Sequence, residues 1–277
     1  MMENQTSSSF PVVALLTDFG LRDGFVGAMK GVILSHAPTA KIVDISHEIE
    51  PFDVASAAFL LDWSVPYFPV GTVFQVVVDP GVGTQRDILV LEAFKRRFVF
   101  PDNGVISQVW SRVGENKQLV RATNRSLWLD AVSSTFHGRD IFAPLAAFLA
   151  NGGDLDEIGP TIQQPGVLLP QPRCEFGDSH VQGEIVYIDR FCNLVTTIER
   201  GPLLTWIEEH NLNHRNVAIH VGSTKLRGIA GGYGDVAQGS PVAVFDGYDR
   251  LEIAVNQERA DRSLGARIGD RVTVRAS

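Results

Sequence analysis

The first half of the chain alternates strand-like and helix-like segments, and this order restricts the fold more than any other feature. Short apolar runs at 11–18, 40–46 and 71–79 alternate with segments of helical spacing at 24–37 and 53–65. Strand–helix–strand units of this kind predict a parallel sheet covered by helices. The run at 71–79 is almost entirely apolar, as expected for a strand buried on both faces. We therefore predict an α/β domain with a mainly parallel sheet flanked by helices.

The pattern changes after a predicted hairpin at 87–104 and a predicted helix at 141–153. Residues 161–178 are rich in proline and show little periodicity, which indicates a linker. Beyond it, short strand-like segments are separated by Gly, Asp and Asn turns, and one helix-like stretch at 202–211 interrupts them. This pattern is typical of a small barrel or sandwich. The expected strands are VQGEIVYID, NVAIHVG, SPVAVFD, RLEIAVN and DRVTVRA.

Composition sets the class of protein. The chain has 277 residues, of which 44% are hydrophobic and 20% charged, so it can bury a full core. A net charge of −8 argues against a nucleic acid as partner, because phosphate binding needs clustered Lys and Arg. No apolar run of about 18 residues predicts a membrane span. Cys174 and Cys192 form no C-x-x-C pair, so we expect a reduced, cytoplasmic location.

Four segments follow from these patterns. The opening MMENQTSSSF is polar and lacks the apolar stretch of a signal peptide, so residues 1–10 are predicted to be a disordered tail. The α/β domain is expected at 11–160, the linker at 161–178, and a smaller all-β domain at 179–277.

Polar side chains follow the predicted strands of the first domain. Asp18 ends the first strand, and Asp79 ends the third and begins a glycine-containing turn that closes at Arg86. The segment FHGRD (136–140) adds His137 just before a helix. Ligands bind beyond the carboxyl ends of strands in open α/β sheets, so we expect these loops to converge on a site.

Three common chemistries do not fit these loops. The turn PGVGTQR has neither the lysine and hydroxyl of a P-loop nor a G-x-G-x-x-G pattern. The scattered histidines lack H-E-x-x-H spacing, so no metal ligand set is predicted. No G-x-S-x-G elbow occurs. Asp79, Arg86 and His137 remain as a charged trio suited to positioning a water molecule. The alternative interpretation is turn capping and a surface ion pair.

Seven segments taken together resemble the S-adenosyl-L-methionine (SAM) hydrolase (adenosine-forming) family, also called SAM hydroxide adenosyltransferases and related to fluorinase and chlorinase. They occur in the family's order from about residue 12 to residue 257, which is nearly the whole chain. The segments are LLTDFGLRDGFVGAMKGVI (15–33), IVDISHEI (42–49), VVVDPGVGTQR (76–86), PDNG (101–104), TFHGRDIFAP (135–144), YIDRFCNLVTTI (187–198) and LEIAVNQ (251–257).

The resemblance implies a fold and a reaction. It implies an α/β N-terminal domain, a smaller C-terminal β-barrel domain, and a homotrimer with active sites between neighbouring subunits. The implied reaction is attack of water or hydroxide on C5′ of the ribose, which releases methionine and adenosine. A sulfonium is already a good leaving group, so neither a metal nor a cofactor is expected. The implied catalytic residues are Asp79, Arg86 and His137, with the proton acceptor among them left open.

Binding residues are implied in the same way. Asp18 corresponds to the carboxylate that holds both ribose hydroxyls, and Phe52 to an aromatic wall of the ribose. Asp189 corresponds to the acceptor for the methionine ammonium group, and Asn193 to the residue that reads the adenine edge. Tyr248 is a candidate for holding the substrate carboxylate. The alternatives are a helix cap for Asp18, a core position for Phe52 and a hairpin turn for Asn193.

The chain departs from the family at two places. It reads Phe191-Cys192-Asn193 where relatives often read FGN, and Gly247-Tyr248 where relatives often carry Asn-Ser. Because of the second departure, the candidates for binding the substrate carboxylate are Tyr248 and backbone N–H groups. Three other functions are alternatives: a halogenase, a SAM- or nucleoside-binding protein without turnover, and a divalent-metal hydrolase. The short hairpin at 87–101 argues against the halogenase, because those relatives carry an inserted loop there.

Overall fold

The computed structural model describes residues 10–276, so the predicted tail lies outside the described residues except for Phe10. The chain forms two compact units that divide after Leu169. The first part of the expected linker packs on the N-terminal unit, because the Ile162 N–H donates to Leu119 O at 2.8 Å. Each unit is described by itself.

The N-terminal unit is built on a mixed six-stranded sheet of order β2-β1-β3-β5-β4-β6. The first four strands in this order run parallel, whereas β4 and β6 run antiparallel to their neighbours. The sheet is therefore mainly parallel, with the hairpin expected at 87–104 formed by β4 and β5. The strands are β1 (Val12–Thr17), β2 (Lys41–Ser46), β3 (Val73–Val77), β4 (Ile88–Ala93), β5 (Arg96–Pro101) and β6 (Gln118–Arg121).

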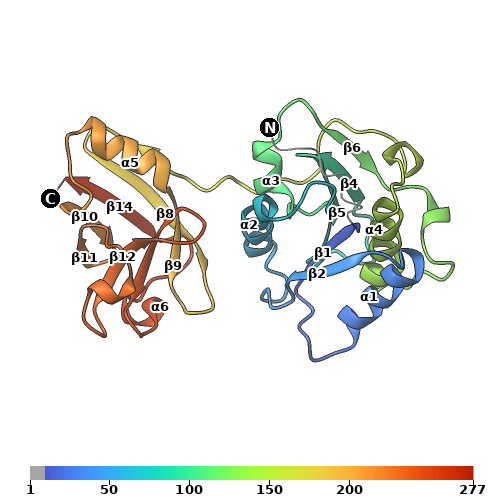
Figure 1. Cartoon of the computed structure of the whole chain (residues 1–277), viewed down its shortest axis with the longest axis horizontal. Coiled ribbons are helices and arrows are strands. Elements are labelled where there is room, and N and C mark those ends of the chain that lie inside the picture. Colours follow the sequence, from blue (N-terminus) through green and yellow to red (C-terminus); the bar gives the residue numbers. More distant parts are fainter. Residues whose placement is uncertain (1–9, 277) are drawn as a thin grey trace, which may run out of the picture. The chain divides into compact units, whose positions relative to one another are not determined.

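Helices cover both faces of this sheet (Figure 1). Alternate residues of β1 enter different cores: Val13 and Leu15 pack with one set of helices, and Ala14 and Leu16 with the other. The first core contains α1 (Phe25–His36) and α4 (Ala143–Ala150), and the second contains α2 (Val54–Ser64) and α3 (Ser107–Arg112). All five residues of β3 are buried, as the apolar run predicted.

Two features differ from the sequence-based expectation. The helix expected at 141–153 is shorter, because a π-helical turn at Gly138–Phe142 precedes α4. Both elements are apolar, and hydrophobic periodicity does not distinguish a π turn from an α turn. The edge strand β6 was not expected; its burial pattern has only two fully buried residues, which gives a weak signal.

The C-terminal unit is an antiparallel, barrel-like sheet of order β11-β10-β14-β8-β9-β13-β12, with β7 also pairing with β8. The Ala230 N–H donates to Ala243 O at 2.8 Å, which links the segment after β11 to β12 and nearly closes the barrel. The elements are β7 (Glu175–Phe176), β8 (His180–Ile188), β9 (Leu194–Glu199), α5 (Arg200–Glu209), β10 (Val217–Val221), β11 (Thr224–Arg227), β12 (Pro241–Phe245), β13 (Arg250–Val255), α6 (Ala260–Ser263) and β14 (Arg271–Ala276).

One core fills the barrel. It contains Leu194 and Ile198 of β9, Leu251 and Ile253 of β13, and Trp206 of the helix α5 that was expected at 202–211. Across residues 10–276, no helix has the length and apolar character that crossing a membrane would require.

Candidate functional site

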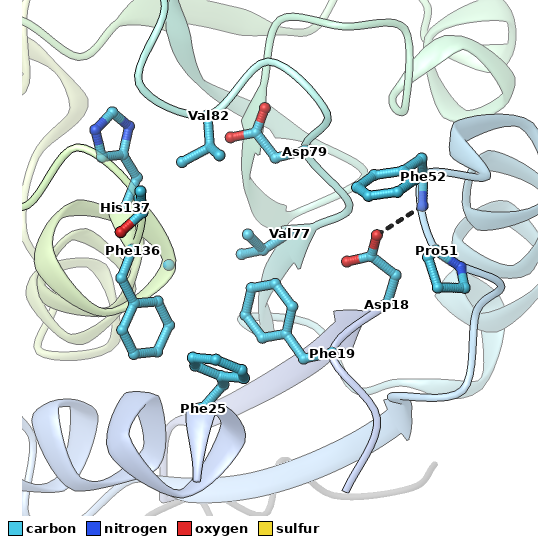
Figure 2. A pocket seen from close by; sticks show the side chains of 12 residues that line it. Asp18, Phe19, Phe25, Pro51, Phe52, Val77, Asp79, Val82, Phe136 and His137 are labelled. Carbon is cyan, nitrogen blue, oxygen red and sulfur yellow. Dashed lines mark hydrogen bonds between the residues drawn. The ribbon is translucent and has the colours of Figure 1, made fainter. Parts of the chain in front are cut away.

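A cavity of about 280 Å³ lies in the N-terminal unit where the loops after β1 and β3 meet. β1 and β3 are parallel neighbours, so Asp18 and Asp79 leave the same edge of the sheet. His137 reaches the cavity from the loop before the π-helical turn (Figure 2). The lining residues are Asp18, Phe19, Phe25, Pro51, Phe52, Val77, Asp79, Val82, Thr135, Phe136, His137 and Gly138.

Arg86 joins Asp79 to His137. Its Nε lies 3.0 Å from both carboxylate oxygens of Asp79, and its Nη2 also contacts Asp79 Oδ2. The same Nη2 lies 3.1 Å from His137 Nδ1. The side chains of Asp79 and Arg86 are only 4% and 9% exposed, so this is a desolvated ion pair. Arg86 does not line the cavity itself. It lies behind Asp79 and His137, which do line it, and acts on the cavity through its contacts with them.

These contacts define the tautomer of His137. A guanidinium group has no acceptor, so His137 Nδ1 must accept the hydrogen bond and the ring proton must lie on Nε2. Burial, and then the positive charge of Arg86, lower the pKa of His137 below its ordinary value of 6.5. At neutral pH the imidazole is therefore neutral and offers an N–H at Nε2.

Neighbouring segments fix the trio of Asp79, Arg86 and His137. The Arg86 guanidinium stacks 5.5 Å from the ring centroid of Phe142. The Asn103 side chain donates to Val78 O at 2.8 Å and so anchors the strand end that carries Asp79. Gly83 has φ +76°, and a Cβ there would lie 2.3 Å from Ser134 O. Only glycine therefore lets the Asp79–Arg86 loop pack this closely on the loop that carries His137.

Asp18 does not cap the following helix, which begins at Phe25 after Gly24. Its Oδ2 instead accepts the Phe52 N–H at 2.9 Å, the contact drawn in Figure 2. Phe52 has φ +71° and is 70% exposed, so it is not a core residue. A bulky residue in the left-handed region is a strained backbone position. The hydrogen bond from the Phe52 N–H to Asp18 stabilises this strained conformation beside the cavity.

Aromatic rings form another wall. Phe19, Phe25 and Phe136 contact one another with centroids 5.2–6.0 Å apart, in tilted and edge-on arrangements. They come from the loop after β1, the start of α1 and the segment before His137. One side of the cavity is therefore apolar, and the opposite side carries Asp18 and Asp79, as Figure 2 shows. A nucleoside combines an aromatic ring, whose faces can stack on an apolar wall, with hydroxyl donors.

The polar residues after β2 have a structural role. His47 is buried, with Nδ1 2.8 Å from Thr17 Oγ1 and Nε2 3.1 Å from Asp44 Oδ1. Lys30 completes the chain with a 2.6 Å bond to Asp44 Oδ2. Burial opposes ionisation of Asp44, but hydrogen bonds from Lys30 and His47 hold its pKa below the ordinary value. This series of hydrogen bonds, from Lys30 through Asp44 and His47, fixes Thr17, the residue before Asp18.

The remaining expected residues lie in the C-terminal unit. Asp189 Oδ1 accepts the N–H groups of Phe191 and Asn193 at 2.9 and 2.8 Å, which closes the turn between β8 and β9. Asn193 thus lies in a hairpin turn, as its alternative interpretation expected. Unlike most turn residues, it is only 7% exposed. The Tyr248 N–H donates to Asp246 Oδ1 at 2.8 Å in the turn between β12 and β13. The Tyr248 side chain is 43% exposed.

Sequence reasoning assigned no role to three residues that organise these sites. Asn103 belongs to the PDNG segment, and Asp140 follows His137 by three positions. Asp140 is fully buried, and its Oδ2 accepts the Ser133 N–H at 2.8 Å, so it fixes the loop before His137. Glu252 on β13 is 3% exposed although it alternates with core residues. Across 10–276, no three His, Cys, Asp or Glu side chains gather closely enough to hold a metal ion.

The chain matches two family models. Residues 13–159 match the SAM hydroxide adenosyltransferase N-terminal domain, and residues 183–273 match the C-terminal domain of the same family. The chain therefore belongs to the SAM hydroxide adenosyltransferase family.

Relatives and solved structures agree with this assignment. A protein of Salinispora tropica named (R)-S-adenosyl-L-methionine hydrolase is 38% identical over 96% of this chain and 98% of its own length. The protein of that name from Thermus thermophilus is 34% identical over 93% and 96%. A fluorinase from an Actinoplanes species is 28% identical over 70% and 73%. The crystal structure of an uncharacterized conserved protein from Thermotoga maritima superposes with a TM-score of 0.86 at 36% identity, covering 95% and 99% of the two chains.

Proposed function

We propose that this protein hydrolyses S-adenosyl-L-methionine to adenosine and L-methionine. The observation that carries the proposal is the desolvated Asp79–Arg86 ion pair, joined to His137, at a cavity that also contains Asp18. The related proteins of Salinispora and Thermus, both named as hydrolases of this substrate, support the same reaction. In this assignment Asp79, Arg86 and His137 serve the nucleophile, and Asp18 and Phe52 hold the ribose.

The reaction needs one bond to form and one to break. A water oxygen attacks C5′ of the ribose, the C5′–S bond breaks, and its electron pair returns to sulfur to give the neutral thioether of methionine. One proton leaves the attacking water and passes to solvent. The leaving group is already cationic, so the protein has to supply alignment and a better nucleophile.

The geometry favours a division of work within the trio. The His137 Nδ1 lone pair is committed to Arg86, so the imidazole acts as a hydrogen-bond donor through Nε2–H and not as the base. Each carboxylate oxygen has two lone pairs, so Asp79 can accept a hydrogen of the attacking water while it binds Arg86. The charge of Arg86, buried behind both residues, stabilises the hydroxide that develops between them.

The cavity holds the nucleoside part of the substrate in this proposal. Its volume of about 280 Å³ is close to the lower limit of about 300 Å³ for ligand pockets, which is small for the whole of SAM. From the C-terminal unit, Asn193 reads the adenine edge, Asp189 accepts the ammonium group and Tyr248 holds the carboxylate. We further propose the homotrimer of the family, with each site formed between neighbouring subunits.

The test is incubation of the purified protein with each sulfonium epimer of SAM, in halide-free buffer containing a chelator. Adenosine and methionine in equal amounts, with one proton released per turnover, are expected from the (R) epimer named in the relatives. Chromatography separates the nucleosides, and a pH indicator follows the proton.

Each alternative predicts a different result. Intact SAM with tight calorimetric binding would contradict hydrolysis and favour a binding protein. A 5′-halogenated nucleoside formed only after halide is added would favour the halogenase. Activity lost in chelator and restored by a divalent metal would favour the metal hydrolase.

A further inference from the structure

A buried carboxyl group lies beneath the Asp189–Asn193 turn of the C-terminal unit. Glu252 is 3% exposed, and its Oε1 accepts the Tyr233 hydroxyl at 2.8 Å. The segment around Tyr233, with Ala230 and Val236, packs over the outer face of β12 and β13. This segment covers a strand position that an open sheet would expose to water.

Asn193 connects this carboxyl group to the proposed ammonium acceptor. Its side chain interacts with the carboxyl groups of both Asp189 and Glu252 and lowers the pKa of each. A side-chain amide carries two N–H donors on one nitrogen, so two carboxyl neighbours orient that nitrogen toward them. With the nitrogen used in this way, the amide oxygen is the end of Asn193 left to accept from a ligand. Glu252 thus fixes which end of Asn193 a substrate meets.

Negative charge is concentrated around Glu252. Asp189 and Asp246 are the charged groups that act on it most strongly, and Tyr233 is its titratable hydrogen-bond partner. Within residues 10–276, none of these three carboxyl groups forms an ion pair with Lys or Arg. The nearby Arg250 guanidinium binds Glu199 and Thr197 O, and its positive charge also acts on Asp246. Burial, with the charges of Asp189 and Asp246, raises the pKa of Glu252 to about 7.

We propose that Glu252, held by Tyr233, is a positioning residue for the substrate: it orients Asn193, which reads the adenine edge, and Asp189, which accepts the ammonium group, and it releases its proton to solvent when the ammonium group binds. This inference rests on the proposed function, in which Asp189 accepts that ammonium group. A cation bound at Asp189 partly cancels the negative charge that acts on Glu252 and so stabilises its ionised form. Binding of the ammonium group and loss of the Glu252 proton are therefore linked, and each favours the other.

The linkage sets the direction and size of the effect. With a pKa of about 7 in the free protein, about a tenth of Glu252 is ionised at pH 6 and about nine tenths at pH 8. If the ammonium group binds the ionised form, the apparent dissociation constant falls about tenfold over this range. For a ligand without an ammonium group, the apparent dissociation constant should not change over this range.

The probe is S-adenosyl-L-homocysteine, which carries the ammonium group but has a neutral sulfur and so is not cleaved. Calorimetric titration at pH 6, 7 and 8, in two buffers of different ionisation enthalpy, measures both affinity and proton release. We expect the tenfold change and proton release at pH 7 in the wild type, and neither in Glu252→Gln. Adenosine, which lacks the ammonium group, should bind with no pH dependence in this range.

Two further variants make the test sharper. Tyr233→Phe removes a hydrogen bond that lowers the Glu252 pKa, so the midpoint of proton release should move to higher pH. This variant also tests the inference if Glu252→Gln does not fold. Glu258→Gln changes an exposed carboxyl group of the same unit and should behave as the wild type.

The inference is wrong if Glu252→Gln keeps the pH dependence, or if Tyr233→Phe leaves the midpoint unchanged. It is also wrong if the wild type binds the probe with no proton release. Failure of the proposed function is a separate result: no adenosine is formed from SAM, whatever the binding experiment gives.

Discussion

At the scale of single residues, Arg86 is the group on which the site depends. It neutralises a carboxylate that is 4% exposed and at the same time fixes the imidazole of His137. Lysine keeps the charge but lacks the planar fork that reaches Asp79 and His137 together. We expect Arg86→Lys to lower kcat by about 100-fold or more, the size of effect seen when one charge-stabilising donor is lost. The dissociation constant for S-adenosyl-L-homocysteine should change little.

The control for this prediction is Arg112→Lys. Arg112 also binds both oxygens of a largely buried carboxylate, Asp62, at 3.0 Å, but it lies between α2 and α3 and away from the cavity. It should leave kcat unchanged. If Arg86→Lys weakened binding while turnover survived, the role of Arg86 in serving the nucleophile would be wrong.

His137 makes a prediction about pH. Burial and the charge of Arg86 lower its pKa, so the neutral imidazole is the form present at neutral pH. Since the folded protein holds the proton less tightly than the unfolded chain, both activity and this contribution to stability are complete above pH 6.5 and are lost as pH falls through the lowered pKa. We expect kcat to form a plateau at neutral pH and to fall on the acid side. A fall that began above pH 7 would contradict the tautomer argument.

Substitutions at His137 test which nitrogen matters. Asn places a polar atom near the position of Nδ1, and Gln places one near Nε2. If donation from Nε2–H to the water is the essential contact, His137→Gln should retain about tenfold more activity than His137→Asn, which corresponds to one hydrogen bond of about 1.4 kcal/mol. Single-turnover rates on SAM measure this difference. The reverse order would place the essential contact at Nδ1.

At the scale of elements, the site depends on the packing of one loop on another. Gly83 has φ +76°, and a Cβ would overlap Ser134 O. Gly83→Ala should therefore cost at least about 1–2 kcal/mol in backbone strain, and should displace Asp79 and Arg86 from His137. We expect a lower melting temperature and a loss of kcat larger than the loss of stability explains. Gly114→Ala, at an open position with ordinary φ, is the matched control and should change neither.

The elements also show where sequence reasoning succeeds. Buried parallel strands such as 71–79 are found from their apolar runs, and the residues that end them follow from the sheet-edge rule. Glu252 could not be found in this way, because alternation with Leu251 and Ile253 predicts a solvent-facing side chain. The segment 230–236 covers that face, and nothing in β13 itself signals the cover. The π-helical turn before α4 was missed for a similar reason, since it is held by contacts distant in sequence or outside the helix: Gly138 O accepts from Gln75 of β3, and Asp140 accepts from the preceding loop.

At the scale of the whole molecule, the proposed function assigns substrate-binding residues to both units. Asp18, Asp79 and His137 belong to the N-terminal unit, and Asp189 and Asn193 to the C-terminal unit. In the proposed homotrimer, with sites formed between neighbouring subunits, each site takes one set of residues from each of two chains. This arrangement predicts that two different inactive variants can restore each other.

Mixing Arg86→Lys with Asp189→Asn tests this arrangement. Each variant alone should be nearly inactive, because every site contains one altered set. In randomly mixed trimers, a site that joins the N-terminal unit of Asp189→Asn to the C-terminal unit of Arg86→Lys is wild type in both halves, whereas the opposite pairing is altered in both. Random assembly from equal amounts gives about a quarter of the sites this composition, so about a quarter of wild-type activity is expected after the subunits are unfolded and refolded together. Light scattering of the wild type should give the mass of three 30.3 kDa chains. A monomer, or a mixture no more active than its parts, would contradict sites formed between subunits and would leave the chemistry of the trio to be carried within one chain.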